Sequence, residues 1–212
     1  MNINLFFDKI FYINLDKDTD RDAKMVEQFK RYDISNFERI SGTVVEVVPD
    51  ISYWRNFNQN KINEKYVLGG LGCRNSHWRI MKTALERRYN KILILEDDVV
   101  FTKDPHQVLK DNESELDDWD MLYFGGTEED NYRGQIVGAY AYGLNRKLIE
   151  EIYHMLLTSG MEVDNFYAKV LFHMSDNHSK SGKYIIKKME PFNTVNIDFK
   201  CISNINKNDY TE

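Results

Sequence analysis

Apolar and polar positions along the chain form blocks that predict strands and helices in alternation. Apolar, β-branched and aromatic runs predict strands at 9–15 (KIFYINL), 91–95 (KILIL), 120–126 (DMLYFGG), 136–144 (IVGAYAYGL) and 183–189 (KYIIKKM). Apolar residues at helical spacing predict helices at 20–32, 75–88, 146–158 and 164–174. Strands that alternate with helices, and strands that are apolar almost throughout, predict an α/β fold with a mostly parallel central sheet flanked by helices.

Local signals mark where some elements begin. Thr19 or Asp20 is expected to cap the helix at 20–32. Asp104-Pro105 predicts a capping aspartate followed by proline at the first position of a short helix. The polar, Asn-rich stretch 56–65 suits a surface excursion, and the C-terminal NINKNDYTE is expected to fray. No linker stands out, so residues 1–212 are predicted to form a single domain.

Composition and charge narrow the class of protein. With 42% hydrophobic and 29% charged residues, the chain reads as an ordinary globular protein. A formal net charge of −6 disfavours a nucleic-acid binder, which needs a basic face. No run approaches the ~20 apolar residues of a transmembrane span, and no signal peptide is recognised at the N-terminus. Cys73 and Cys201 lie far apart and are expected to be reduced thiols, which predicts a cytoplasmic location.

Three adjacent carboxylates, Glu96, Asp97 and Asp98, follow the apolar strand at 91–95. Ligands of open α/β sheets bind beyond the carboxyl ends of the strands, where these acids are expected to lie. If the chain stays extended there, Glu96 and Asp98 project to one side and Asp97 to the other. Crowded carboxylates need a cation or strong donors, and hard oxygen ligands suit Mn²⁺ or Mg²⁺. The alternative is an exposed acidic turn that aids solubility.

The stretch 69–101, GGLGCRNSHWRIMKTALERRYNKILILEDDVVF, resembles the signature of glycosyltransferase family 25. That family combines a Gly-x-Gly-Cys-x-x-Ser-His segment with a helix, a strand and Glu-Asp-Asp. Further similarity falls in the same order at 11–21 (FYINLDKDTDR), 141–147 (AYGLNRK) and 162–171 (EVDNFYAKVL). Family members include bacterial lipooligosaccharide galactosyltransferases and collagen hydroxylysine galactosyltransferases.

The resemblance implies a GT-A-type nucleotide-diphospho-sugar transferase fold and a metal-dependent reaction. It implies transfer of a hexose, galactose or glucose, from a UDP-sugar donor to a hydroxyl of a glycan or hydroxylysine acceptor, with inversion. Asp98 would bind Mn²⁺ (or Mg²⁺) directly, and Glu96 would act through the ribose or a metal-bound water. Asp97 would face the ribose or the transferred sugar. A cation there would neutralise charge on the leaving nucleoside diphosphate.

Further donor-binding candidates lie in the matching segments. Ile13, Asn14, Leu15 and Arg21 surround the end of the first strand, and the guanidinium of Arg21 is a fork-shaped phosphate donor. The alternative for Arg21 is a surface charge paired with a neighbouring acid.

A glycine cluster precedes the predicted helix at 75–88, and two polar residues of the family motif open that helix. Gly69, Gly70 and Gly72 suggest close backbone approach or an anion at the helix start, although such a cluster also marks any tight loop. Ser76 and His77 match the family motif and are placed on the donor side, with His77 on the first helical turn. A packed or capping histidine is the alternative.

Asp164 is the candidate general base, because an inverting transferase needs a carboxylate to take the proton of the attacking hydroxyl. A simple helix cap is the alternative for this residue. Competing acids are Glu128, Glu129 and Asp130, which follow a glycine turn.

Two departures from the family pattern keep other functions open. Tyr140 stands where the family often has histidine, and Ser203-Asn204-Ile205 replaces Ser-Asp-Ile. A catalytically degenerate module that binds a nucleotide-sugar or glycan is therefore the main alternative. A glycoside hydrolase with two carboxylates across a cleft and a metal-dependent phosphoesterase are further alternatives.

Overall fold

The computed structural model describes residues 1–47, 64–129, 135–175 and 182–198. Its helices are α1 (Ile3–Phe6), α2 (Thr19–Arg31), α4 (Glu64–Glu86), α5 (Pro105–Asp111), α6 (Arg146–Thr158) and α7 (Val163–Phe166), with short turns η1 (Glu113–Glu115), η3 (Tyr167–Leu171) and η4 (Phe172–Met174). Its strands are β1 (Lys9–Asn14), β2 (Phe37–Ser41), β3 (Lys91–Glu96), β4 (Val99–Phe101), β5 (Met121–Tyr123), β6 (Thr127–Glu129), β7 (Gln135–Val137), β8 (Ala141–Asn145), β9 (Ile186–Lys188) and β10 (Val195–Ile197).

Six strands form the central sheet in the order β2-β1-β3-β8-β5-β9. β1 runs parallel to β2 and β3, and β5 runs parallel to β9. β8 is antiparallel to both of its neighbours, β3 and β5. The predicted fold class, α/β with a mostly parallel sheet flanked by helices, is confirmed, with β8 as the reversed strand.

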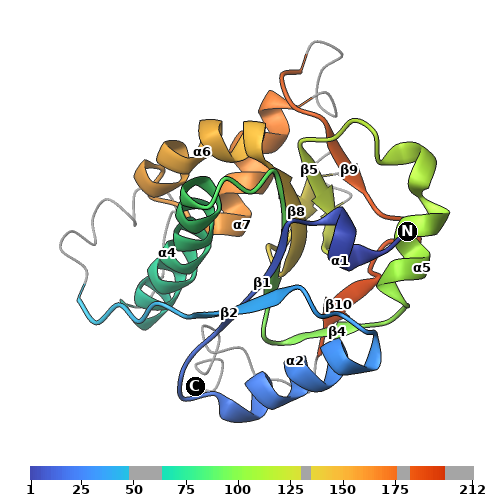
Figure 1. Cartoon of the computed structure of the whole chain (residues 1–212). Helices are drawn as coiled ribbons and strands as arrows, with labels where there is room; N and C mark the ends of the chain where they lie inside the picture. The colour runs from blue at the N-terminus through green and yellow to red at the C-terminus, as the bar shows by residue number, and fades with distance from the viewer. Residues whose placement is uncertain (48–63, 130–134, 176–181, 199–212) are drawn as a thin grey trace.

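Helices cover both faces of this sheet, which explains why β1, β3, β5 and β8 are apolar almost throughout. Figure 1 shows α4 beside α6 and α7, with α2 and α5 on the opposite side of the central strands. Phe11 and Ile94 point into the core under α4 and α6. Their neighbours Tyr12 and Leu93 point into the other core, against Phe29 of α2. The alternation along each strand thus builds two cores on one sheet.

Several predicted elements differ from the structure at their ends. The predicted helix 20–32 is α2, but the residue at its N-cap position is Asp18, and neither Thr19 nor Asp20 caps it. The predicted strand 136–144 is two strands, β7 and β8, because Gly138 has φ +109° and the chain turns there. Asp104 does cap α5, since its side chain accepts a hydrogen bond from the backbone of His106.

The helix predicted at 75–88 begins eleven residues earlier, at Glu64. The glycine cluster therefore lies inside α4 rather than before it, and the predicted anion site at a helix start is wrong. A side chain at Gly72 would place a Cβ 2.4 Å from the carbonyl oxygen of Thr43. The glycine is needed there because α4 packs directly against the backbone that follows β2.

Some predictions fall on residues outside the described ranges: most of the polar stretch 56–65, Asp130, Cys201, the Ser203-Asn204-Ile205 segment and the C-terminal residues. Within the described part of the chain, no helix combines the length and the apolar character that a membrane crossing requires.

Candidate active site

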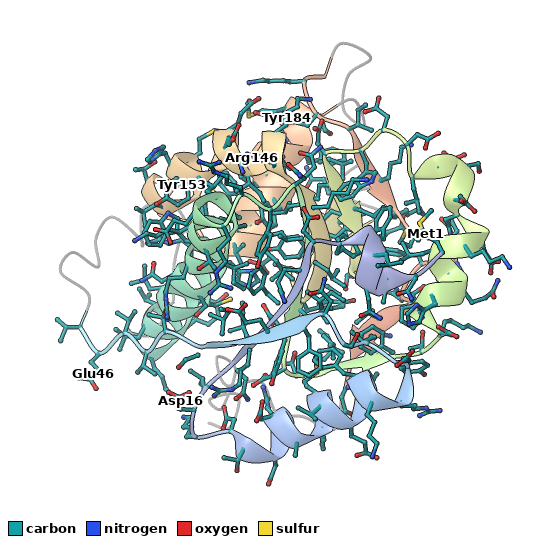
Figure 2. All side chains as sticks on the ribbon, viewed as in Figure 1. Met1, Asp16, Glu46, Arg146, Tyr153 and Tyr184 are labelled. Carbon is teal, nitrogen blue, oxygen red and sulfur yellow. The ribbon has the colours of Figure 1, made fainter. Side chains whose placement is uncertain are left out.

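The carboxyl ends of three parallel strands meet at one edge of the sheet. Asn14 at the end of β1 is in register with Ser41 at the end of β2, and Ile13 is in register with Glu96 at the end of β3. Asp16, which follows β1, and Glu46, which follows β2, lie on the same side of the molecule (Figure 2). This edge is where ligands of α/β sheets bind.

A pocket of about 240 Å³ opens at this edge. Eight of the residues predicted from sequence line it: Ile13, Leu15, Arg21, Ser76, His77, Glu96, Asp97 and Asp98. The rest of the pocket wall comes from the segment that joins β1 to α2, from the segment after β2 and from α4. Residues from four separate parts of the sequence therefore converge on one cavity.

The acidic segment does not stay extended. β3 ends at Glu96, Asp97 and Asp98 form a turn, and the chain then enters β4, which pairs with β10 outside the central sheet. The expectation that alternate acids project to opposite sides is therefore wrong, and all three line the pocket. The turn occurs where the chain leaves one sheet for another, which places the carboxylates at the sheet edge.

Asp97 is held by two donors. Asn14 Nδ2 donates to Asp97 Oδ2 at 2.8 Å, and Arg21 Nη1 donates to Asp97 Oδ1 at 2.6 Å. Burial raises the pKa of Asp97, while the bonds to Asn14 and Arg21 oppose that rise. Asn14 is 1% exposed, and its amide oxygen accepts from Arg39 Nε at 2.9 Å. In this structure Asn14 therefore positions Asp97 rather than facing the pocket itself.

Asp98 has no such support. Its Oδ2 lies 3.8 Å from Arg21 Nη1, whereas its buried Oδ1 has no hydrogen-bond partner among the described residues. Burial and then the negative charge of Glu96 raise the pKa of Asp98 to about 7. An unpaired buried carboxylate oxygen is costly, and a cation is the natural partner for it.

Glu96 is anchored from α4. His77 Nε2 lies 3.2 Å from Glu96 Oε1, and the thiol of Cys73 lies 3.7 Å from the same oxygen. His77 is fully buried, and its Nδ1 lies 2.7 Å from the hydroxyl of Tyr142. Tyr142 in turn accepts from the hydroxyl of Tyr167 at 3.1 Å. The hydroxyl of Tyr142 therefore lies within hydrogen-bond distance of both His77 Nδ1 and the hydroxyl of Tyr167.

His77 lies in the middle of α4 and not on its first turn, so that part of the prediction is wrong. Ser76 has a structural role in this arrangement. Its hydroxyl accepts from the backbone of Thr43 at 2.8 Å and donates to the carbonyl of Gly72 at 2.8 Å. The bond from Thr43 fastens α4 to the segment after β2, which forms one wall of the pocket, whereas the bond to Gly72 lies within α4.

Asp164 lies near the acids but does not line the pocket. Glu162 occupies the N-cap position of α7, so the predicted alternative, that Asp164 is a helix cap, is wrong. Asp164 Oδ1 accepts from the backbone of Asn165 at 2.7 Å. Burial, then the negative charges of Glu162 and Glu96, raise the pKa of Asp164. Asp164 is thus close enough to Glu96 for their charges to interact.

Competing acids lie in β6, and three pocket residues were not predicted as ligands. Glu128 pairs with Lys188 Nζ at 2.7 Å, in β6. Lys17, Cys73 and Thr43 line the pocket but were not singled out as ligands. Cys73 could have been recognised from the sequence, because it lies four residues before His77 and therefore on the same face of a helix.

The sequence profile of glycosyltransferase family 25, described as an LPS biosynthesis protein, matches residues 7–190. The chain therefore belongs to glycosyltransferase family 25.

Curated relatives agree with this assignment. Human procollagen galactosyltransferase 2 is 27% identical over 135 residues, which are 56% of this chain and 21% of the relative. A glycosyltransferase 25 family member of Anopheles gambiae is 28% identical over 126 residues, 55% of this chain and 21% of the relative. The human inactive glycosyltransferase 25 family member 3 is 25% identical over 160 residues, 64% of this chain and 26% of the relative. This chain spans about a fifth to a quarter of the length of these relatives.

A solved structure that resembles this chain is a glycosyltransferase involved in the glycosylation of the major capsid of PBCV-1. It has 14% sequence identity and a TM-score of 0.46, and the match covers 84% of this chain and 79% of that chain.

Proposed function

We propose that this chain is a metal-dependent glycosyltransferase of the GT-A type. It moves a hexose from a UDP-sugar to a hydroxyl of a glycan or hydroxylysine acceptor, with inversion of the anomeric centre. The observation that supports this best is the buried Oδ1 of Asp98, which lacks a hydrogen-bond partner within the described part of the chain and belongs to a carboxylate turn that lines a pocket at the carboxyl edge of the sheet. Relatives named procollagen galactosyltransferase favour galactose as the sugar.

The donor set fits a hard divalent cation. Asp98 presents a carboxylate oxygen that has no hydrogen-bond partner among the described residues, and Asp97 is already occupied by Asn14 and Arg21. Asp98 would hold Mn²⁺ or Mg²⁺, and Glu96 would support it through a water or the ribose. When bound, such an ion neutralises negative charge on the diphosphate leaving group.

Basic residues that line the same pocket suit the donor phosphates. Arg21 and Lys17 both line the cavity. Arg21 already balances Asp97, so its guanidinium holds a fixed orientation towards the acidic turn. Lys17 is exposed and carries a point charge that can approach a phosphate from solvent. Together they offset the charge that three carboxylates would otherwise present to an anionic substrate.

Asp164 is assigned as the general base. A carboxylate takes a proton most effectively when its pKa approaches the working pH. Burial and the neighbouring acids Glu162 and Glu96 raise the pKa of Asp164 in that direction. Asp164 would accept the proton of the acceptor hydroxyl on the face of the sugar opposite the diphosphate leaving group.

The experiment is a screen of UDP-galactose, UDP-glucose, GDP-sugars and CMP-sugars for release of the nucleotide in the presence of Mn²⁺ and candidate acceptors. We expect turnover with a UDP-hexose that is abolished by EDTA and by Asp98→Asn. Full turnover in EDTA, or in the Asp98→Asn variant, would refute the assignment. Tight UDP binding without any release of UDP would instead identify the chain as a nucleotide-sugar binding module.

A further inference from the structure

Three side chains of different chemistry converge on the wall of the pocket beside the acidic turn. They are Cys73 and His77 of α4 and Glu96 at the end of β3, and one potential ligand atom of each lies within 4.8 Å of the other two. Cys73 Sγ is 3.7 Å from Glu96 Oε1, and His77 Nε2 is 3.2 Å from the same oxygen. Asp97 and Asp98 are not members of this group.

The spacing matches a tetrahedral zinc site. With Zn–S near 2.3 Å and Zn–N or Zn–O near 2.0–2.1 Å, tetrahedral ligand atoms lie about 3.3–3.6 Å from one another. The two measured separations to Glu96 Oε1 fall close to that range. Cys73 and His77 are one helical turn apart, so α4 presents both from the same face. The ligand atoms of Cys73 and His77 also lie within 4.8 Å of each other.

The surroundings of His77 provide what a metal-bound histidine requires. Its Nδ1 lies 2.7 Å from the hydroxyl of Tyr142, and the two rings stack with centroids 5.7 Å apart. Such an outer partner fixes the orientation of a ligating imidazole and favours coordination through Nε2. In the metal-bound form His77 Nδ1 would carry the proton and donate it to the hydroxyl of Tyr142, while Nε2 would face the ion.

We propose that Cys73, His77 and Glu96 form a Zn²⁺ site, distinct from the cation held by Asp98, with a fourth coordination position that faces the pocket. All three side chains line that pocket, so a water or a ligand atom can complete the tetrahedron. Thiolate and imidazole ligands favour Zn²⁺ over Mg²⁺ and Mn²⁺, whereas the carboxylate of Asp98 favours the harder ions. Ligand chemistry therefore separates the two sites.

Binding of Zn²⁺ would release the thiol proton of Cys73. Burial, together with the negative charges of Glu96 and Asp164, keeps the pKa of the Cys73 thiol well above its ordinary value. The thiol proton would pass to solvent when the sulfur binds Zn²⁺. Two positive charges then compensate the thiolate and the carboxylate, which would otherwise repel each other.

Cobalt titration of the purified chain tests the site directly, because Co²⁺ replaces Zn²⁺ and reports its ligands by absorption. We expect one equivalent of Co²⁺ with tetrahedral d–d bands and a thiolate charge-transfer band, both removed by added Zn²⁺. Cys73→Ser should lose the charge-transfer band. The matched control is Cys201→Ser, which changes the other cysteine of the chain and should keep it. A band that persists in Cys73→Ser, or no tetrahedral signal in the wild type, would overturn the proposal.

A measurement on the unaltered protein covers the case in which a variant misfolds. Cys73 is partly exposed and lines the pocket, so an alkylating reagent can reach it. Zn²⁺ should slow alkylation of the peptide that contains Cys73, and Mg²⁺ should not. Equal alkylation rates with and without Zn²⁺ would contradict the site. The Asp98→Asn variant should retain the protection, which separates this proposal from the assignment of Asp98.

Tyr142, whose hydroxyl lies next to His77 Nδ1, allows a test in which Zn²⁺ affinity should fall without being abolished. Tyr142→Phe removes the hydroxyl that orients the imidazole but leaves all three ligands in place. Loss of such an outer partner lowers metal affinity by about 10–100-fold. An unchanged Zn²⁺ affinity in this variant would show that His77 is not a ligand.

Discussion

Replacing Asp98 with asparagine is expected to stabilise the protein when no cation is present and to remove its stabilisation by a cation. The reason is the environment of the carboxylate. Asp98 is largely buried, its Oδ1 has no hydrogen-bond partner among the described residues, and Glu96 and Asp97 are adjacent anions. Asparagine keeps the shape of the side chain and removes the charge, so the cost of burying that charge disappears.

The magnitude follows from the pKa. Burial and Glu96 raise the pKa of Asp98 from 3.8 to about 7. Each pKa unit corresponds to about 1.4 kcal/mol, so at pH 8 the ionised group destabilises the folded state by at most about 4 kcal/mol. The attraction of Arg21 is already included in this pKa, and solvent and structural relaxation screen part of the remaining cost, so we expect a gain of about 2 kcal/mol. For a domain of this size that is a rise in Tm of about 4–8 °C.

The pH dependence has a defined sign. The folded state holds the Asp98 proton more tightly than the unfolded state between pH 3.8 and about 7. Stability contributed by the neutral carboxyl is therefore full below pH 3.8 and is lost as the pH rises to about 7. The difference between Asp98→Asn and wild type should be near zero at the acidic end and should reach its plateau above neutral pH.

The assay is thermal or urea unfolding in EDTA across this pH range, repeated with Mn²⁺ and UDP. A ligand at 100 times its Kd adds about 2.7 kcal/mol to a protein that binds it only when folded. Wild type should gain that increment and Asp98→Asn should not, so the order of stability reverses. Asp118→Asn, which makes the same charge change at an exposed position, is the control and should match wild type. An Asp98→Asn variant that is no more stable in EDTA, or that keeps the full ligand effect, would refute the reasoning.

Three further substitutions test other parts of the site. Gly72→Ala brings a Cβ to 2.4 Å from Thr43 O and should destabilise the fold by about 1–3 kcal/mol, measured by urea denaturation; unchanged stability would show that α4 can move away freely. Asp164→Asn should lower the rate of transfer by about 10²–10⁴-fold while UDP affinity is kept, measured by single-turnover kinetics and calorimetry; a wild-type rate would exclude a base at this position. Asn14→Ala should weaken UDP binding by releasing Asp97, although Asn14 itself is buried, and an unaltered affinity would contradict its positioning role.

The sequence was informative wherever a local pattern determines structure. β1 and β3 were predicted because both faces of these strands are covered, which makes the interiors of the runs at 9–15 and 91–95 apolar. The pocket edge was predicted because polar residues stand directly after those strands. The reversed direction of β8 could not be predicted, since an apolar strand reads the same in a parallel or an antiparallel position.

The errors at α4 have a tertiary cause. A glycine cluster before a predicted helix locally indicates a turn or an anion site. Gly72 instead lies inside α4, where the nearby carbonyl of Thr43 leaves no room for a side chain. The cluster of Cys73, His77 and Glu96 likewise depends on α4 packing on β3, which no local pattern specifies. The sequence alone shows only the four-residue spacing of Cys73 and His77, which places these two side chains on one face of a helix.

The most direct measurement of the central claim is calorimetric titration of the protein with UDP, in Mn²⁺ and in EDTA. We predict that UDP binds in Mn²⁺, that it does not bind in EDTA, and that it does not bind to Asp98→Asn under either condition. UDP binding of equal strength with and without the cation, or no binding in either, would contradict it.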